Sequence, residues 1–218
     1  LRAGRRWLDY LKGTVRLDVN FVRRYLISEA DIREGPNLLD AIEWAYQYGA
    51  AQDVFELTRI ALEYLDHQGM WNEIEYYVGR GLELARSTGN QRYVAWFCDG
   101  FAWLYEQRGD FEAFRPMAEE ALALYRASGD LYGQVTILMK LAGWQRKTGH
   151  FEQAREFCDQ ARALCETAQD GDLLAEVESG YGKLARDMHD WDAAWAHFSA
   201  VRDWFQKRTE QSPVDESL

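Results

Sequence analysis

The sequence predicts an all-α fold, a right-handed α-solenoid in which antiparallel helix pairs stack on one another. Its 218 residues include only three prolines and are rich in the good helix formers Ala, Leu, Glu, Gln and Arg. Apolar residues recur at helical spacing, as at Val94, Phe97, Phe101 and Leu104, and no alternating strand pattern competes. Glycine, aromatic and small residues also recur at a fixed spacing along the sequence, which indicates a repeat architecture.

The marks repeat every forty residues. Glycine forms two series offset by twenty residues: Gly69, Gly109 and Gly149, followed by His189, and then Gly49, Gly89 and Gly129. An aromatic residue stands two positions after each member of the first series: Trp71, Phe111, Phe151 and Trp191. Small residues form a further series at Gly81, Ala121 and Ala161. These marks share one register, so they predict equivalent structural units along the chain.

Each repeat is interpreted as two helices of about seventeen to eighteen residues joined by a tight turn. Glycine at the end of a helix adopts the left-handed conformation without steric cost, and Asp or Asn after it caps the next helix, as in Gly109-Asp110 and Gly129-Asp130. One pair cannot bury its apolar face alone, so pairs must stack. Because Trp71 and Trp191 keep the glycine register, both are expected in the core, and losing either should cost about 3–5 kcal/mol.

The chain is expected to have three parts. Residues 1–50 form a basic helical lead-in or cap, with helices over residues 17–30 and Pro36–Tyr48, the second starting near Pro36 and stopping at Gly49. Residues 51–207 hold four repeats, at about 51–90, 91–130, 131–170 and 171–207. Residues 208–218 are polar and are expected to form a flexible tail. Pro116 should kink or delay the second helix of the second of these repeats.

The repeats resemble tetratricopeptide repeats over residues 52–207. The matching segments are Tyr105 with Gly109-Asp110-Phe111, Leu141-Ala142 with Gly149-His150-Phe151 and Ala154, and Gly182 with Trp191 and Ala194. The period of forty exceeds the standard thirty-four and implies longer helices. The family's closing proline is absent, and Ile74 and Phe114 replace its alanine. The resemblance implies a non-catalytic module that binds a protein or peptide.

A second resemblance lies in the lead-in. Asn37-Leu38, Ala41 and Trp44-Ala45 are similar to an Asn-Leu-x-x-Ala-x-x-Trp-Ala segment of bacterial signalling ATPases of the NB-ARC and MalT-like kind. There the segment precedes a C-terminal repeat sensor, so the resemblance implies the sensor domain of a signalling or transcription-regulating ATPase. The missing initial Met agrees with a fragment of such a protein. The alternatives are an ordinary capping helix here, and, for the whole chain, a free-standing adaptor or scaffold or a receptor for a small ligand or peptide.

Charge and cysteine content limit which classes of partner and which cellular compartment are expected. The net charge of −11 disfavours nucleic acid as a partner, because that binding needs phosphate neutralisation. Seven basic and two acidic residues give residues 1–24 a charge of +5, which leaves −16 for the rest. No apolar run is long enough for a membrane span, and the N-terminus lacks a secretory signal. Three cysteines, Cys98, Cys158 and Cys165, suit a reducing compartment, so a cytoplasmic location is expected.

No catalytic, cofactor or metal site is predicted, and the chain is not expected to be an enzyme. Gly182-Lys183 and Lys147-Thr148 lack the remaining residues of a phosphate-binding loop. Cys158 and Cys165 share a helical face without a nearby His pair, so they are interpreted as core residues rather than zinc ligands. His189 beside Asp190 is better explained by a turn and a helix cap.

The predicted binding site is a groove lined by the first helix of each repeat. Its positions lie thirteen, ten, six and three residues before each turn: Glu56, Arg59, Glu63 and Asp66; Trp96, Asp99, Trp103 and Glu106; Thr136, Met139, Gly143 and Arg146; Glu176, Ser179, Lys183 and Arg186. The series runs from acidic through aromatic to basic. It predicts a partner with a basic end, an apolar middle and an acidic end.

Two points stay open from the sequence. Trp96 and Trp103 are seven residues apart on one stripe, and they either line the groove, where Trp commonly anchors partners, or pack between repeats. Chaperone-tail binders of the family clamp a terminal carboxylate with Lys and Asn, but no Asn occurs at the groove positions, so that activity is not expected. The oligomeric state is also open, because solenoid ends need capping and end helices could pair between chains.

Overall fold

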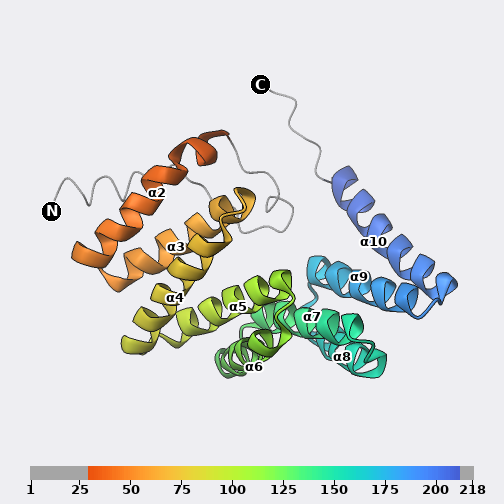
Figure 1. The fold of residues 1–218 in the computed structure, drawn as a ribbon. Coiled ribbons are helices and arrows are strands. Elements are labelled where there is room, and N and C mark those ends of the chain that lie inside the picture. The colour runs from red at the N-terminus through yellow and green to blue at the C-terminus, as the bar shows by residue number, and fades with distance from the viewer. Residues whose placement is uncertain (1–28, 212–218) are drawn as a thin grey trace. The chain divides into compact units, whose positions relative to one another are not determined.

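The computed structural model describes residues 29–211, and side chains from Pro36 to Arg208. Nine α-helices occupy this part of the chain (Figure 1): α2 Glu29–Tyr48, α3 Ala51–His67, α4 Trp71–Ser87, α5 Gln91–Arg108, α6 Phe111–Ser128, α7 Leu131–Lys147, α8 Phe151–Ala168, α9 Gly171–Asp187 and α10 Trp191–Gln211. Consecutive helices form antiparallel pairs, so the predicted all-α repeat fold is confirmed.

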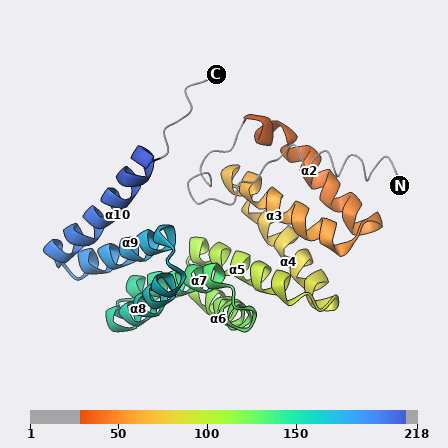
Figure 2. The same ribbon diagram turned by 180° about the vertical axis from the view of Figure 1, so that it is seen from behind.

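The chain divides into two compact units, residues 1–108 and residues 109–218. In the first unit each of the helices from α2 to α5 packs against the next one along the chain. In the second unit the helices from α6 to α10 do the same, and α7 also contacts α9. Figure 2 shows the same helix hairpins within each unit from behind. The packing is local in sequence, as stacked repeats require.

The predicted glycine turns are confirmed at five positions. Gly69, Gly89, Gly109, Gly129 and Gly149 all have φ between 67° and 82°, in the left-handed region. At Gly129 the amide donates to the carbonyl of Arg126, and the next amide, of Asp130, reaches back to Tyr125. The prediction was wrong for Gly49, which has no positive φ, because its amide still donates to the Ala45 carbonyl at 2.9 Å in the manner of a helix.

Non-glycine residues take the left-handed position at the last two described turns. Gln169 has φ 54° and His189 has φ 63°, and the amides after them make the same backward hydrogen bonds as those after the glycines. The predicted caps also form: the carboxylates of Asp110, Asp130, Asp170 and Asp190 accept from backbone amides two or three residues later. The turn geometry is therefore retained although its preferred residue is lost.

Exchanging residues at these turns should change stability in opposite directions. Gly109→Ala should lower the free energy of unfolding by about 1 kcal/mol, because a Cβ there meets no neighbour and the cost is only that of the left-handed backbone. Gln169→Gly should raise it by up to about 1 kcal/mol by removing the same strain. Urea unfolding followed by circular dichroism measures both. Equal signs for the two substitutions would contradict the argument.

The two prolines inside helices behave differently from expectation. The prediction that a helix starts near Pro36 is wrong, since α2 begins at Glu29 and contains Pro36. Pro116 does not delay its helix either: α6 starts at Phe111, where Asp110 caps it by accepting from the Ala113 amide at 3.1 Å.

The predicted helix over residues 17–30 lies almost wholly outside the described residues. The last helix, α10, continues to Gln211, beyond the predicted start of the tail.

Aromatic and small residues build the core of the first unit. Phe55 of α3 stacks on Tyr93 of α5 with ring centroids 4.4 Å apart, and meets the edge of Phe97 at 5.8 Å. Gly81 of α4 faces the Phe97 ring so closely that an added Cβ would come within 2.3 Å of it. The series of small residues at positions 81, 121 and 161 is therefore a packing requirement, and Ala121 and Ala161 are also fully buried.

The expectation that Trp191 is a core residue is wrong. Its side chain is 62% exposed, whereas Trp71, Phe111 and Phe151 at the equivalent positions are half-buried. Phe111 shows the reason, because its ring stacks on Trp144 of the following helix α7, with centroids 6.3 Å apart. α10 is the last of the described helices, so no later described helix lies against Trp191 as α7 lies against Phe111; its ring meets that of His189, with centroids 5.8 Å apart.

Candidate protein-binding surfaces

In the first unit, the predicted groove residues lie on the two helix faces that packing leaves partly open. Trp96, Asp99, Trp103 and Glu106 on α5 are all half-buried, while most of the α5 residues between them are buried. On α3, Glu56, Arg59 and Glu63 are half-buried and Asp66 is exposed. The stripes appear because the opposite faces pack into the core through Phe55 and Phe97.

The two tryptophans of α5 combine packing with exposure. Trp96 meets the neighbouring Phe97 ring edge-on, with centroids 5.1 Å apart and an interplanar angle of 79°. Neither Trp96 nor Trp103 is among the buried core residues or among the largely exposed apolar ones. Both tryptophans are therefore half-buried, and the Trp96 ring has one side against Phe97.

A polar contact links α3 to α5 near the start of the α3 stripe. The amide group of Gln52 on α3 donates to Glu56 at 2.8 Å and to the Tyr93 hydroxyl of α5 at 3.0 Å. This places the start of the α3 stripe beside the start of α5. Together the stripes carry five carboxylates against one arginine: Glu56, Glu63, Asp66, Asp99 and Glu106, with Arg59. These two partly exposed stripes, on α3 and α5, are therefore acidic and aromatic.

In the second unit, part of the predicted groove is engaged in packing. Met139 of α7 lies over Gly180 of α9, where an added Cβ would come within 2.1 Å of the methionine methyl group. Thr136, predicted to line the groove, is buried, so that expectation is wrong. Lys183 and Arg186 on α9 are exposed. The basic part of the predicted series thus remains accessible mainly on α9.

Asp187 is a residue that the sequence interpretation missed. Arg146 of α7 forms an ion pair with its carboxylate, and the Nε of Arg186 donates to it at 2.9 Å. Burial alone would raise the pKa of Asp187, but the hydrogen bonds from Arg186 and Arg146 outweigh it and hold the pKa below its usual value. Arg146 is thereby tied to α9 and contributes less positive charge to the surface than its position in sequence suggested.

A second missed cluster joins α8, α9 and α10. Glu178 accepts from Arg162 at 2.7 Å and lies 2.6 Å from His197 Nδ1, while the Tyr181 ring stacks on His197 and lies under the Arg162 guanidinium. Burial, together with the hydrogen bond to Asp159, raises the pKa of Tyr181. No sequence motif marked these residues, because their alignment depends on the packing of three helices. The cluster cross-links the second unit.

The thiols of the second unit are buried core groups. Cys158 and Cys165 are buried as predicted, and burial raises the pKa of each thiol to about 11. Within residues 29–211 there is no group of three or more His, Cys, Asp or Glu side chains arranged to hold a metal ion. Among the described helices, none combines the length and apolar character that crossing a membrane requires.

The comparisons agree with a helical-repeat protein. The tetratricopeptide repeat family matches residues 94–128, which cover most of α5 and all of α6. The match places a tetratricopeptide repeat in this segment of the chain. The crystal structure of BtubC (BKLC) from P. vanneervenii is similar, with a TM-score of 0.69 and 15% identity over 87% of this chain and 79% of that one, a likeness that shows a shared fold. A search of curated proteins finds no match.

Proposed function

We propose that this chain is a non-catalytic module that binds a protein or peptide, and that the inner stripes of α3 and α5 form its primary binding surface. The observation that carries the proposal is the pairing of two half-buried tryptophans, Trp96 and Trp103, with the surrounding carboxylates. Anchored indoles supply apolar contact at low entropic cost, and Trp is enriched at interface hot spots. A tetratricopeptide repeat array is typically a protein-binding scaffold.

The negative charge of the α3 and α5 stripes favours a basic partner. Five carboxylates and one arginine favour a segment with Lys or Arg on both sides of apolar residues, because complementary charge raises the association rate and excludes acidic partners. Lys183 and Arg186 on α9 of the second unit would favour an acidic end of the same or another partner. The small-ligand alternative receives less support, since neither stripe encloses a buried polar cluster suited to one small molecule.

We further propose that the chain serves as the sensor part of a bacterial signalling or transcription-regulating ATPase. Support comes from the Asn37-Leu38 to Trp44-Ala45 segment and its place at the start of the repeats. In α2 the motif residues Leu38, Ala41 and Ala45 are buried, so a capping role explains them equally well. The genomic reading frame decides: a phosphate-binding loop and a winged helix upstream would support the sensor role, and their absence from the complete frame would favour an adaptor.

The binding proposal is tested by selecting from a random peptide library displayed on phage. Wild-type chain should enrich peptides with basic residues flanking apolar ones. The Trp96→Ala/Trp103→Ala variant should bind the selected peptide at least about tenfold more weakly. Tyr48→Ala is the matched control, because Tyr48 is an aromatic residue of the same unit that is 60% exposed and off both stripes. Fluorescence anisotropy measures the affinities, and circular dichroism confirms that each variant is folded.

Charge reversal keeps the test decisive if the tryptophan variant loses structure. Asp66→Lys changes an exposed residue at the end of α3 and should weaken binding of a basic peptide while reducing its dependence on salt. Lys183→Glu should leave the same peptide unaffected if only its basic part binds the first unit. Selection of peptides without basic character, or equal binding by wild type and Asp66→Lys, would refute the proposed surface.

A further inference from the structure

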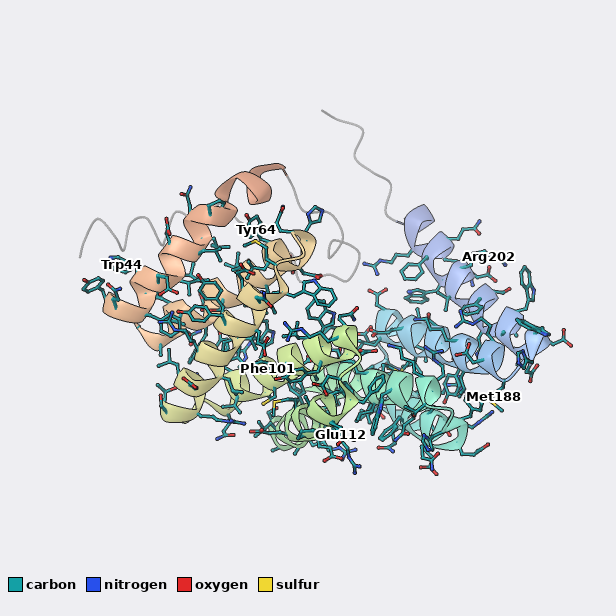
Figure 3. All side chains as sticks on the ribbon, in the orientation of Figure 1. Trp44, Tyr64, Phe101, Glu112, Met188 and Arg202 are labelled. Carbon is teal, nitrogen blue, oxygen red and sulfur yellow. The ribbon has the colours of Figure 1, made fainter. Side chains whose placement is uncertain are left out.

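Two arginines in the described part of the chain are held in the same way, by an aromatic ring and a carboxylate of a neighbouring helix. The Arg80 guanidinium of α4 lies 3.7 Å from the centre of the Tyr46 ring on α2, and its Nη1 donates to both carboxylate oxygens of Glu43 at 2.7 and 2.8 Å. Trp44, labelled in Figure 3, lies between Glu43 and Tyr46 in the sequence of α2. The guanidinium is therefore stacked on one group and hydrogen-bonded to the other.

The second example lies in the other unit. The Arg162 guanidinium of α8 lies 4.1 Å from the centre of the Tyr181 ring on α9, and it donates to Glu178 at 2.7 Å. In both examples the carboxylate and the ring are three residues apart on one helix, Glu43 with Tyr46 and Glu178 with Tyr181, so they share a face. We call this combination a ring–carboxylate pair.

A ring–carboxylate pair is suited to arginine more than to lysine. The guanidinium is planar, so its face can stack on the ring while the N–H groups at its edge donate to the carboxylate. The lysine ammonium is a compact, strongly hydrated charge and has no face to stack. Such a pair can therefore distinguish two basic residues that carry the same charge.

The stripe on α5 contains the same combination twice. Trp96 and Asp99 are three residues apart, as are Trp103 and Glu106, and all four side chains are half-buried. Here the ring precedes the carboxylate, the reverse of the order on α2 and α9, but both orders place the two groups on one helix face. Within residues 36–208, no guanidinium lies over either indole. An arginine supplied by a partner would complete each pair.

Given the proposed binding function of this surface, on which the inference rests, we propose that the α5 stripe recognises arginine rather than basic residues in general. The partner presents two arginines, one to each ring–carboxylate pair of α5. Equivalent groups of the two pairs are seven residues apart, which is about 10 Å at the helical rise. An Arg-x-x-Arg segment in the polyproline II conformation has this separation, because every third residue returns to the same face after about 9 Å.

Paired peptide libraries test the preference. Two phage-displayed libraries have the same design, except that every basic codon encodes Arg in one and Lys in the other. The wild-type chain should enrich binders from the Arg library, with Arg-x-x-Arg over-represented. The best peptide is then compared with its all-Lys counterpart of equal net charge. Fluorescence anisotropy should give a Kd at least about fivefold higher for the Lys peptide.

Substitutions in the chain show whether the α5 stripe causes the preference. Trp96→Leu/Trp103→Leu keeps apolar side chains but removes the ring faces, so the ratio of the two Kd values should fall to within about twofold of one. Tyr48→Leu is the matched control, because Tyr48 is exposed and off both stripes, and it should change neither Kd. Asp66→Lys on α3 should weaken both peptides by a similar factor and leave their ratio unchanged.

A second variant of the stripe keeps the test decisive if circular dichroism shows that the leucine variant is not folded. Asp99→Asn/Glu106→Gln removes the carboxylate charges at nearly constant shape, and it should also lower the ratio of the Lys-peptide Kd to the Arg-peptide Kd. Both stripe variants are therefore expected to lose discrimination between the peptides, although by removing different halves of each pair.

The outcomes separate the arginine preference from the proposed function. Equal Kd values for the Arg and Lys peptides, or a preference for Arg that survives in every folded stripe variant, would overturn the arginine preference and leave a surface for basic peptides in place. Enrichment from neither library would overturn both. A preference that is lost in the stripe variants and kept in Tyr48→Leu and Asp66→Lys is the expected result.

Discussion

Replacing Phe97 with alanine is expected to lower the free energy of unfolding of the first unit by about 3–5 kcal/mol. The ring is fully buried between α3, α4 and α5, where it touches Phe55 and lies under Gly81. Its removal loses apolar burial and leaves a cavity that the surrounding rigid helices can fill only partly. Urea unfolding followed by circular dichroism measures the change.

Trp191→Ala is the informative comparison for this substitution. The sequence register placed Trp191 in the core with the same expected cost, but a side chain that is 62% exposed should cost less than about 0.5 kcal/mol in a monomer. The measurement is made at low protein concentration, so that any association of chains does not contribute. A loss of several kcal/mol at Trp191, or a loss below 1 kcal/mol at Phe97, would contradict the packing described above.

Gly81→Ala should lower the free energy of unfolding by about 1–3 kcal/mol, although alanine is the better helix former. Three atoms of the Phe97 ring would lie within 2.9 Å of the new Cβ, and the buried ring cannot move aside. Gly79→Ala in the same helix is the matched control. Its Cβ would meet only the Phe101 ring at 3.6 Å, an ordinary contact, so it should stabilise α4 by roughly 0.5–1 kcal/mol.

The two substitutions at Gly81 and Phe97 should be strongly coupled. In a Phe97→Ala background the clash is gone, so Gly81→Ala should become neutral or stabilising. A double-mutant cycle from the same unfolding curves gives the coupling energy. Additive effects of the two substitutions would show that the close approach of Gly81 to the Phe97 ring does not limit what position 81 can accept.

Much of the fold was predictable because its determinants are local. A left-handed glycine and a following Asp cap act within one turn, so Gly109-Asp110 and Gly129-Asp130 define helix ends wherever they occur. The packing of each helix on its chain neighbour follows from the period of forty. The same local reasoning failed at Pro36, which lies inside α2, and at Gly49, which follows the end of α2 without taking the left-handed conformation.

The candidate surface was predictable only in outline. Counting back from the turn identified the stripe of α5 on which Trp96, Asp99, Trp103 and Glu106 are half-buried. Counting could not find Asp187, which ties Arg146 to α9, or the Glu178–His197 contact, because these depend on the relative positions of side chains on different helices. It also placed Thr136 in a groove, although this side chain is buried.

By itself, the sequence determined the helix content, most helix ends and the forty-residue register, since these follow from backbone conformation and periodic apolar residues. The tertiary structure alone decided which members of that register are covered. Phe111 and Trp191 occupy the same place in the repeat, yet Phe111 stacks on Trp144 of the next helix and Trp191 remains exposed. Burial is a property of the neighbouring helix, and a periodic pattern cannot report whether that neighbour is present.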